Sequence, residues 1–545
     1  MHCARCDSGE WANAGARVRN MPGARSRFIH GTGHYNAPVR WRRVARPELL
    51  IPLLAIVLRV IAGPRVIDDA YILFRYAQNL IAGNGFVFNP GEPVFGITTP
   101  LFGGLLAAMA AVSGGTAAPF PALALGVNAV ADAATCWLLI ALGRRLDRPA
   151  AGILAALVWA VAPMSVTFAI GGMETSVFIL LMTATLYFHS SGRPVAAAGC
   201  AGLSLVTRPD ALILVVLLVL ERIRQVWRRR QPPGAYPAVR LAEVAAFLAP
   251  VAGWAALAWS EYGSPIPQSI VAKAAAYHLP AEAAFVRLLQ HFATPFLEEL
   301  AFGPAAIAVG IALYLILFGL GAMEAVRRRP ETWPIFAYPV AYFLAFSIAN
   351  PLIFRWYLAP PLPMFILGIF LGVARLAADL RRPAVAWALG AAAILLTLNG
   401  WTLRPDTGPA RPAPQMAFVG LEDIYTEIGR RMNAVVAPDE VVAAGDIGAI
   451  GFFSQARILD LLGLISPQVV PYYPLADEDY VINFAVSSQA IEDLRPDYVV
   501  ILEVYGRATV LQDAGFLHAY HLIETIPTDL YGSQGMLVFR RMTSP

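Results

Sequence analysis

Residues 66–92 read VIDDAYILFRYAQNLIAGNGFVFNPGE, and this stretch decides how the rest of the chain is interpreted. Its apolar side chains repeat at helical spacing, at Ile72, Tyr76 and Leu80. Asp68 or Asp69 begins the predicted helix, and Gly83 ends it. A short amphipathic helix lying at a membrane surface fits this pattern, because one of its faces is apolar and the others carry polar groups.

The composition on either side of this stretch is that of a membrane protein. Of 545 residues, 57% are hydrophobic and only 14% are charged, and the mean hydropathy is +0.58. A soluble domain usually carries about a quarter charged residues. The net charge of +4 comes from 41 basic and 37 acidic residues, a balance too small to indicate nucleic-acid binding. We therefore expect a multi-pass protein of the cell membrane.

Apolar runs predict about eleven transmembrane helices, each near the roughly 20 residues that cross a bilayer. The predicted spans lie near residues 48–64, 100–117, 121–143, 149–170, 174–190, 195–220, 240–260, 301–323, 333–349, 355–377 and 384–401. An odd count with a cytoplasmic N-terminus places the C-terminus outside.

Basic clusters orient the predicted spans. Residues 1–46 hold nine arginines against two acidic residues and predict a disordered, basic cytoplasmic tail. The basic loops at 222–240, 327–330 and 381–383 then also fall inside, as the positive-inside rule requires. The same count puts the arginines of 144–148 outside, against that rule. Splitting 195–220 at Thr207-Arg-Pro-Asp210 would move them inside, and one early apolar run is a candidate for a re-entrant segment.

The predicted domains follow from these boundaries. An all-α transmembrane domain spans 47–401 and contains a first outer loop at 65–99, and a linker rich in Pro and Arg follows at 402–414. Residues 415–545 predict a small α/β domain outside the cytoplasm, with a helix near 418–435. Its predicted strands lie at 440–446, 495–502 and 535–539.

Asp68 and Asp69 allow two interpretations. Carboxylates favour helix N-termini for ordinary electrostatic reasons, so one of the two aspartates can be a plain cap. Two adjacent aspartates at a membrane surface are nevertheless costly unless they are solvated or paired. A carboxylate in this position can also take the proton from an attacking hydroxyl group. We expect one aspartate to cap and the other to act as a base, in an order that the sequence leaves open.

Three consecutive segments together resemble integral-membrane glycosyltransferases of the GT-C fold. They are Asp68-Asp-Ala-Tyr-Ile-Leu-Phe-Arg75, Gly83-Asn-Gly-Phe-Val-Phe-Asn-Pro-Gly-Glu92 and Thr98-Thr-Pro-Leu101. These segments are most similar to cell-wall arabinofuranosyltransferases that use decaprenylphosphoryl arabinose, and to their relatives. The resemblance is strongest over 66–105. Weaker matching motifs are Gly172-Met-Glu174, Thr207-Arg-Pro-Asp210, Tyr262 to Lys273, Arg355-Trp-Tyr357 and Asp460 to Pro467.

The resemblance implies a reaction. A sugar, hexosyl or pentosyl, moves with inversion from a polyprenyl-phosphate donor in the outer leaflet to a hydroxyl group of a glycan or lipid acceptor. One aspartate of the pair is the base. The transition state resembles an oxocarbenium ion, and the leaving phosphate requires positive charge nearby. The implied partners are the lipid-linked donor, the acceptor and the membrane, with no nucleic acid.

Three basic residues are candidates for that phosphate, namely Arg75, Lys273 and Arg355, and Tyr357 beside Arg355 joins the substrate-binding set. Arginine suits bidentate phosphate contact and lysine a point contact. The alternative for Arg75 is a solvated face or snorkelling to lipid headgroups. For Lys273 and Arg355 the alternative is an interfacial anchor.

Other polar residues carry weaker signals. Glu174 follows two glycines at the mouth of an apolar helix and is a candidate for binding acceptor hydroxyls or a divalent metal; pairing with the helix dipole is its alternative. Arg208 and Asp210 are expected to pair with each other. Asp446 ends a strand in a glycine-rich segment and predicts a turn; a contact with the acceptor glycan is its alternative. Cys3-x-x-Cys6 with His30 and His34 resembles a zinc pattern, and a disordered tail is the simpler interpretation.

The sequence thus predicts a membrane glycosyltransferase that builds a cell-envelope glycan. The first alternative is a transporter or flippase of lipid-linked sugars, which would more often show paired interrupted helices at the bilayer midplane. The second is a glycan-binding scaffold without activity.

Overall fold

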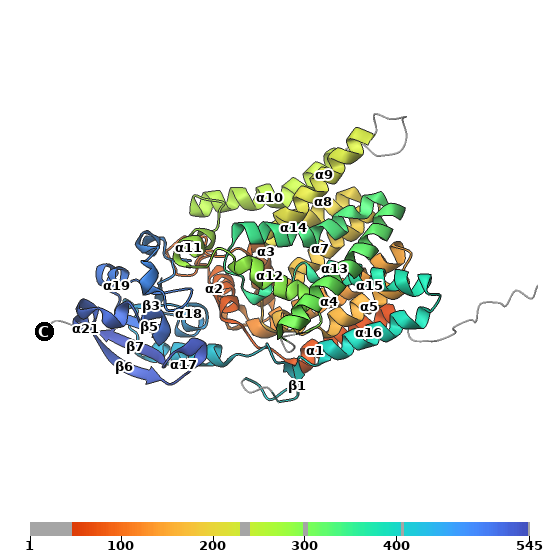
Figure 1. Cartoon of the computed structure of the whole chain (residues 1–545). Coiled ribbons are helices and arrows are strands. Elements are labelled where there is room, and N and C mark those ends of the chain that lie inside the picture. Colours follow the sequence, from red (N-terminus) through yellow and green to blue (C-terminus); the bar gives the residue numbers. More distant parts are fainter. Residues whose placement is uncertain (1–45, 229–239, 298–302, 405–407, 543–545) are drawn as a thin grey trace, which may run out of the picture. The chain divides into compact units, whose positions relative to one another are not determined.

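The computed structural model describes residues 46–228, 240–297, 303–404 and 408–542. The predicted N-terminal tail lies outside these residues, and so does the pattern of Cys3, Cys6, His30 and His34. Only the tail's last residue, Arg46, is described, at the N-cap of the first helix. Residues from Arg46 onward form one compact unit, which contains a helical bundle and a C-terminal sheet domain (Figure 1).

The helical part begins at Pro47, and proline occupies the first or second position of many of its helices, where its missing N–H costs no hydrogen bond. Its helices are α1 (Pro47–Ala62), α2 (Asp68–Ile81), α3 (Pro100–Val112), α4 (Phe120–Arg145), α5 (Pro149–Val161), α6 (Pro163–Ile170), α7 (Thr175–Ser190), α8 (Pro194–Thr207), α9 (Leu212–Arg228), α10 (Leu241–Tyr262), α11 (Gln268–Ala276), α12 (Ala283–Ala293), α13 (Gly303–Arg328), α14 (Trp333–Ala349), α15 (Leu362–Asp379) and α16 (Pro383–Leu398).

The chain is a multi-pass membrane protein, but the predicted count of eleven spans is not confirmed. In the described part of the chain, five helices are long and apolar enough to cross a bilayer, or six if α5 and α6, which meet at a 49° bend, form one span. Four further apolar helices are shorter: α3, α7, α8 and α16. The predicted span 195–220 is wrong as a single helix, because it breaks at Pro209 into α8 and α9.

Ion pairs correct the predicted sidedness of residues 144–148. Arg148 binds Glu324 at 2.6 Å, and Arg329 lies 3.4 Å from Asp147. These contacts place the 144–148 loop beside the basic loop at 327–330, at one end of the bundle, whereas the sequence count separated the two loops. The 13-residue helix α3 gives the physical reason, since it is shorter than the roughly 20 residues that a crossing needs.

The bundle is packed through small residues. Helix α4 lies against α1, α5 and α7, and α13 lies against α15. A Cβ atom on Gly143 of α4 would overlap the backbone of Gly152 on α5. Glycine at this crossing therefore allows two backbones to approach closely, which is how helices associate where no water drives them together.

The C-terminal domain is a mixed five-stranded sheet with short helices. Its strands are β3 (Val441–Ala444), β4 (Arg457–Asp460), β5 (Tyr498–Leu502), β6 (Tyr520–Ile526) and β7 (Met536–Arg541). Their order is β4-β3-β5-β7-β6, with β3 parallel to β4 and β5, and β7 antiparallel to β5 and β6. Its helices are α17 (Gly420–Val435), α18 (Gly448–Ser454), α19 (Ser488–Leu494), α20 (Glu503–Gly506) and α21 (Ala514–Ala519). The three predicted strands are present, and β4 and β6 add two more.

The predicted linker at 402–414 is attached to the bundle. Strands β1 (Trp401–Thr402) and β2 (Ala413–Pro414) pair with each other in an antiparallel manner. The indole of Trp401 donates to the carbonyl of Val161 at 2.8 Å, and Arg65 donates to the carbonyl of Ala417 at 2.9 Å. These contacts fix where the chain enters the C-terminal domain.

Helix α2 is buried between the bundle and the sheet domain (Figure 1), so the expected surface helix is wrong in this respect. Nine of its 14 residues are buried. Tyr71 and Phe74, which lie off the predicted apolar stripe, contact Phe452 of α18 with ring centroids 5.4 and 6.3 Å apart. Aromatic residues outside the stripe thus give α2 a second apolar face, which the C-terminal domain covers.

Candidate active site

A cavity of about 580 Å³ lies where loops of the bundle meet the C-terminal domain. Its walls come from α2, the segment before α3, the turns before α7 and α9, α11 and the segment after α14. The charged residues that line it are Asp69, Glu174, Arg208, Asp210 and Lys273, and the aromatic ones are Tyr277, Phe346, Phe354, Trp356 and Tyr357. Three of the predicted substrate-binding residues and one predicted catalytic aspartate are therefore brought together.

Asp69 and Lys273 form the central pair of this cavity. Lys273 Nζ lies 3.7 Å from Asp69 Oδ2 and 4.6 Å from the centre of the Phe354 ring. Burial acts to lower the pKa of Lys273, but the negative charge of Asp69, together with smaller contributions from Tyr357 and Asp460, outweighs it and the pKa is raised. The lysine is therefore a cation at neutral pH, and both side chains of the pair remain partly exposed to the cavity.

Asp68 has a different environment. Its carboxylate accepts hydrogen bonds from the backbone amides of Gly448 at 2.9 Å and Ala449 at 2.7 Å, at the N-terminus of α18. A Cβ atom at Gly448 would overlap the Asp68 carbonyl, so glycine is needed for this approach. Burial and the nearby charge of Asp446 raise the pKa of Asp68 well above its usual value. Asp68 does not line the cavity, and it joins α2 to the C-terminal domain.

Glu174, Arg208 and Asp210 form a buried charge cluster in the cavity wall. Arg208 lies 3.1 Å from Glu174 and 2.9 Å from Asp210, so the expected pairing of Arg208 with Asp210 is present. The guanidinium carbon of Arg208 also lies 4.8 Å from the centre of the Tyr357 ring. Tyr342 donates to Asp210 at 3.2 Å or to the Tyr357 carbonyl at 2.8 Å. This cluster holds Tyr357 against the arginine.

Arg75 does not line the cavity. Its guanidinium donates to the carbonyls of Phe88 at 2.8 Å, Ala456 at 2.7 Å and Gly451, and its side chain is buried. It therefore joins α2 to α18, and it lies neither on a solvated face nor at a lipid headgroup. Burial lowers the pKa of Arg75 to about 9.

Arg355 lies at the rim of the cavity. Its side chain is exposed, and its guanidinium donates to the carbonyl of Met416 at 3.3 Å. The next two residues, Trp356 and Tyr357, line the cavity itself. The segment before α15 therefore contributes aromatic rings to the interior and a cation to the rim.

Two residues of the C-terminal part were not predicted at the site. Asp460 is buried and accepts the amides of Leu462 at 2.9 Å and Ile465 at 3.0 Å, so that Leu464 reaches the cavity. Burial raises the pKa of Asp460 to about 6. Asp446 accepts from the Tyr425 hydroxyl, and burial raises its pKa. The motif Asp460 to Pro467 was visible in the sequence, but nothing in it indicated a loop that closes a cavity.

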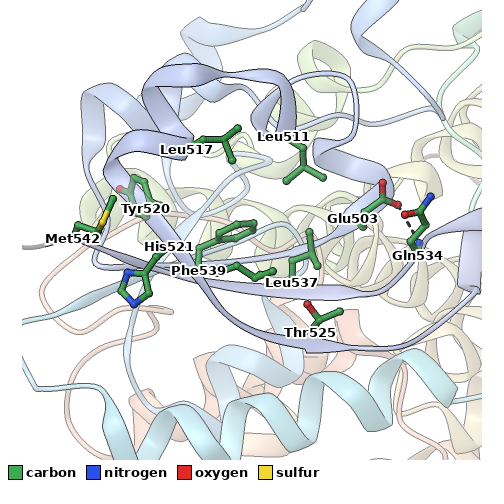
Figure 2. Close-up of a pocket in the computed structure, with 11 residues that line it drawn as sticks. Glu503, Leu511, Leu517, Tyr520, His521, Thr525, Gln534, Leu537, Phe539 and Met542 are labelled. Atoms are coloured by element: carbon green, nitrogen blue, oxygen red, sulfur yellow. Dashed lines mark hydrogen bonds between the residues drawn. The ribbon is translucent and has the colours of Figure 1, made fainter.

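A second cavity, of about 600 Å³, lies within the C-terminal domain between α21 and strands β6 and β7 (Figure 2). Its lining is mainly apolar, and Glu503 accepts the backbone amide of Gln534 at 3.0 Å. Glu503 also pairs with Arg507 at 2.6 Å. None of the predicted site residues lies in it. In the described residues, no group of three or more His, Cys, Asp or Glu side chains is placed to hold a metal ion.

The chain has the fold of the GT-C integral-membrane glycosyltransferases. ArnT from Cupriavidus metallidurans, solved with undecaprenyl phosphate, is 13% identical; the match covers 91% of this chain and 98% of ArnT, with a TM-score of 0.54. The oligosaccharyltransferase AglB from Archaeoglobus fulgidus, solved with an inhibitory peptide and a dolichol-phosphate, is 12% identical over 91% of this chain and 74% of AglB, with a TM-score of 0.52.

Sequence comparison gives a partial relative. The terminal β-(1→2)-arabinofuranosyltransferase of Mycobacterium tuberculosis is 30% identical over 235 residues. The match covers 39% of this chain and 35% of that protein, so the chain spans about a third of the relative's length. Residues 415–539 also match the family described as "Domain of unknown function (DUF8728)". That family covers the C-terminal sheet domain nearly from end to end.

Proposed function

We propose that the protein is a membrane glycosyltransferase that moves a sugar from a polyprenyl phosphate to an acceptor hydroxyl of the cell envelope, at the extracytoplasmic face. The observation that carries the proposal is the Asp69–Lys273 pair inside the cavity, with the Oδ2–Nζ distance of 3.7 Å. The pair supplies a base and a cation within a few ångströms, and a sugar transfer with a phosphate leaving group requires both.

The reaction is a single displacement at the anomeric carbon. The acceptor oxygen forms a bond to that carbon on the face opposite the phosphate, and its proton passes to a carboxylate oxygen of Asp69. The bond between the anomeric carbon and the phosphate oxygen breaks, and the electron pair leaves with the polyprenyl phosphate. Lys273 neutralises the charge that develops on the phosphate, and the configuration at the anomeric carbon inverts.

Two further features of the site support a sugar substrate. The aromatic rings of Tyr277, Phe354 and Trp356 give the cavity flat apolar faces beside its charges, as ligand sites usually have. Fold relatives have been solved with undecaprenyl phosphate and dolichol-phosphate, which are lipid carriers of the proposed chemical class. The partial similarity to an arabinofuranosyltransferase makes a pentose donor the first one to test.

The test is a transfer assay with purified protein in lipid, with polyprenyl-phosphate pentoses and hexoses offered in parallel. We expect Asp69→Asn to lower the rate about 10²- to 10⁴-fold, the usual contribution of a general base. The matched control is Asp379→Asn, which removes an exposed carboxylate at the end of α15. Unchanged transfer by Asp69→Asn would exclude this base. The flippase alternative predicts another result, in which labelled donor crosses a liposome bilayer and is not consumed.

A further inference from the structure

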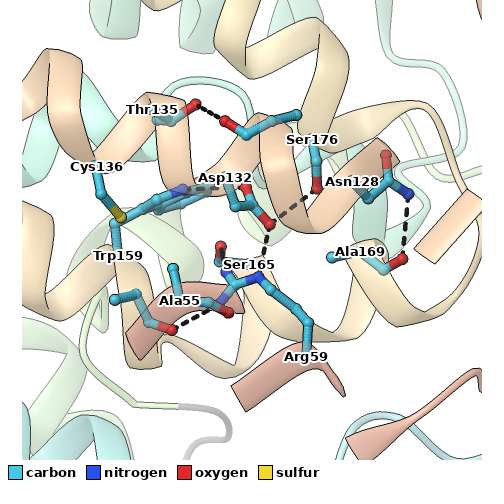
Figure 3. Close-up of polar contacts among 12 residues, drawn as sticks. Ala55, Arg59, Asn128, Asp132, Thr135, Cys136, Trp159, Ser165, Ala169 and Ser176 are labelled. Atoms are coloured by element: carbon cyan, nitrogen blue, oxygen red, sulfur yellow. Dashed lines mark hydrogen bonds and ion pairs between the residues drawn. The ribbon is translucent and has the colours of Figure 1, made fainter. Parts of the chain in front are cut away.

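A buried ion pair lies inside the bundle, away from the cavity (Figure 3). Arg59 of α1 donates from Nε to Oδ2 of Asp132 on α4 at 2.9 Å, and neither side chain has any solvent exposure. Trp159 donates to the other carboxylate oxygen at 3.3 Å. Charges inside a membrane-spanning bundle are costly, and their presence there calls for a function.

The arginine end of the pair holds the bend between α5 and α6. Arg59 donates to the carbonyl of Ala160, near the end of α5, at 2.8 Å and to the hydroxyl of Ser165, in the first turn of α6, at 2.6 Å. One guanidinium thus binds groups on both arms of a 49° bend (Figure 3). This contact links the two arms of the bend.

The α4 side of the network holds the turn between α6 and α7. Ser176, in the first turn of α7, donates to Asp132 at 3.0 Å. Asn128, one turn before Asp132 on α4, donates to the carbonyls of Ala169 at 3.1 Å and Met173 at 2.8 Å. Glu174, which binds Arg208 in the cavity wall, lies between the attachments at Met173 and Ser176.

The same turn also sets the entry into α2. The backbone amide of Arg65 donates to the carbonyl of Ile170 at 2.9 Å, and the backbone amide of Ile67 donates to the carbonyl of Gly171 at 3.0 Å. Two residues after Ile67 comes Asp69. A shift of the α6–α7 turn would therefore move Glu174 directly and Asp69 through this short backbone ladder.

We infer that Arg59, Asp132, Ser176 and Asn128 are positioning residues, which hold Glu174 and Asp69 in the geometry required for transfer without touching the substrate. The inference rests on the proposed function. Stability alone does not account for the ion pair, because apolar side chains of similar volume are often equally stabilising at a buried site. Misplacement of reacting groups by about 1 Å is enough to lower a rate about a hundredfold.

The test uses the mildest change in the network. Ser176→Ala removes the hydrogen bond between α7 and Asp132 but leaves the ion pair intact. We expect kcat to fall about tenfold to a hundredfold with KM for the lipid-linked donor within twofold, because the base is misaligned while Lys273 keeps its place. Ser176→Thr keeps the hydroxyl and should restore most of the rate. The matched control is Thr185→Ala on the same helix, whose hydroxyl donates within that helix to the carbonyl of Leu181 at 2.8 Å.

A second readout does not depend on activity. Met173 lines the cavity beside Glu174, so the rate at which a thiol reagent labels Met173→Cys reports the position of the turn. We expect Ser176→Ala to change this rate at least severalfold and Thr185→Ala to leave it unchanged. The positioning role is overturned if Ser176→Ala leaves both kcat and the labelling rate unchanged, or if Thr185→Ala lowers kcat equally. An inactive wild-type protein would contradict the proposed function instead, and the labelling result would still decide whether Ser176 positions the turn.

Discussion

The carboxylate of Asp69 and the ammonium group of Lys273 lie 3.7 Å apart, and both belong to the wall of one cavity. This distance allows attraction without a fixed hydrogen bond. A phosphate group entering the cavity can therefore share Lys273, and the carboxylate is then left available to an incoming hydroxyl group.

Lys273→Met should raise KM for the lipid-linked donor about tenfold to a hundredfold, the usual loss when one hydrogen bond to a charged group is removed. The side chain of methionine has a similar length, so the stacking on Phe354 is retained in part. Steady-state kinetics with varied donor measures the effect. Lys273→Arg should recover part of the affinity, and a KM equal to that of the wild type in both variants would remove Lys273 from the phosphate site.

Asp68→Ala should destabilise the protein by about 1–3 kcal/mol for each buried amide left unpaired, because Gly448 and Ala449 lose their acceptor. Thermal unfolding in detergent measures the loss. The adjacent variant Asp69→Ala is the control and should unfold near the wild-type temperature. Equal stability of the two variants would show that Asp68 does not fasten α18.

Arg75→Met should lower the unfolding temperature while leaving KM for donor near the wild-type value in the fraction that remains folded. The reason is that its guanidinium binds the carbonyls of Phe88, Gly451 and Ala456 and does not face the cavity. Donor titrations on folded, size-selected protein separate the two effects. A large increase in KM for the donor with unchanged stability would show instead that Arg75 binds the phosphate.

Asp460 should make stability depend on pH. Burial raises its pKa from 3.8 to about 6, so the folded protein binds a proton more tightly than the unfolded chain. Its contribution to stability is therefore complete below about pH 4 and is lost as pH rises through 6. The difference in unfolding temperature between wild type and Asp460→Asn should change with pH inside this window and stay constant above pH 7. A constant difference throughout would contradict the raised pKa.

The sequence predicted the apolar cores of the bundle because long apolar runs are local signals. It located the breaks less well. The 195–220 run is apolar on both sides of Pro209, and only the tertiary structure shows that Arg208 and Asp210 turn into a cavity there. Strand β6 was missed because most of its residues are exposed, so no apolar pattern marks it.

The roles of the two aspartates could not be separated from the sequence. Asp68 and Asp69 are adjacent, and what distinguishes them is the N-terminus of α18, which follows Asp68 by 380 residues. The burial of Arg75 could not be predicted for a similar reason, since its partners are backbone carbonyls that carry no signature in side-chain chemistry. The sequence pointed to four of the cavity residues, namely Asp69, Glu174, Lys273 and Tyr357. It did not predict that they lie in one cavity.

The attachment of Asp68 to α18 has a consequence for how water is excluded. Because Asp68 and Asp69 are adjacent, a movement of the C-terminal domain that carries Asp68 along with Gly448 would also displace the proposed base. We expect an open enzyme to be chemically idle, so that a bound donor is protected from hydrolysis until the domain is seated. Release of free sugar in the absence of acceptor measures this protection. Asp68→Ala should uncouple the seating of the C-terminal domain from the placement of Asp69.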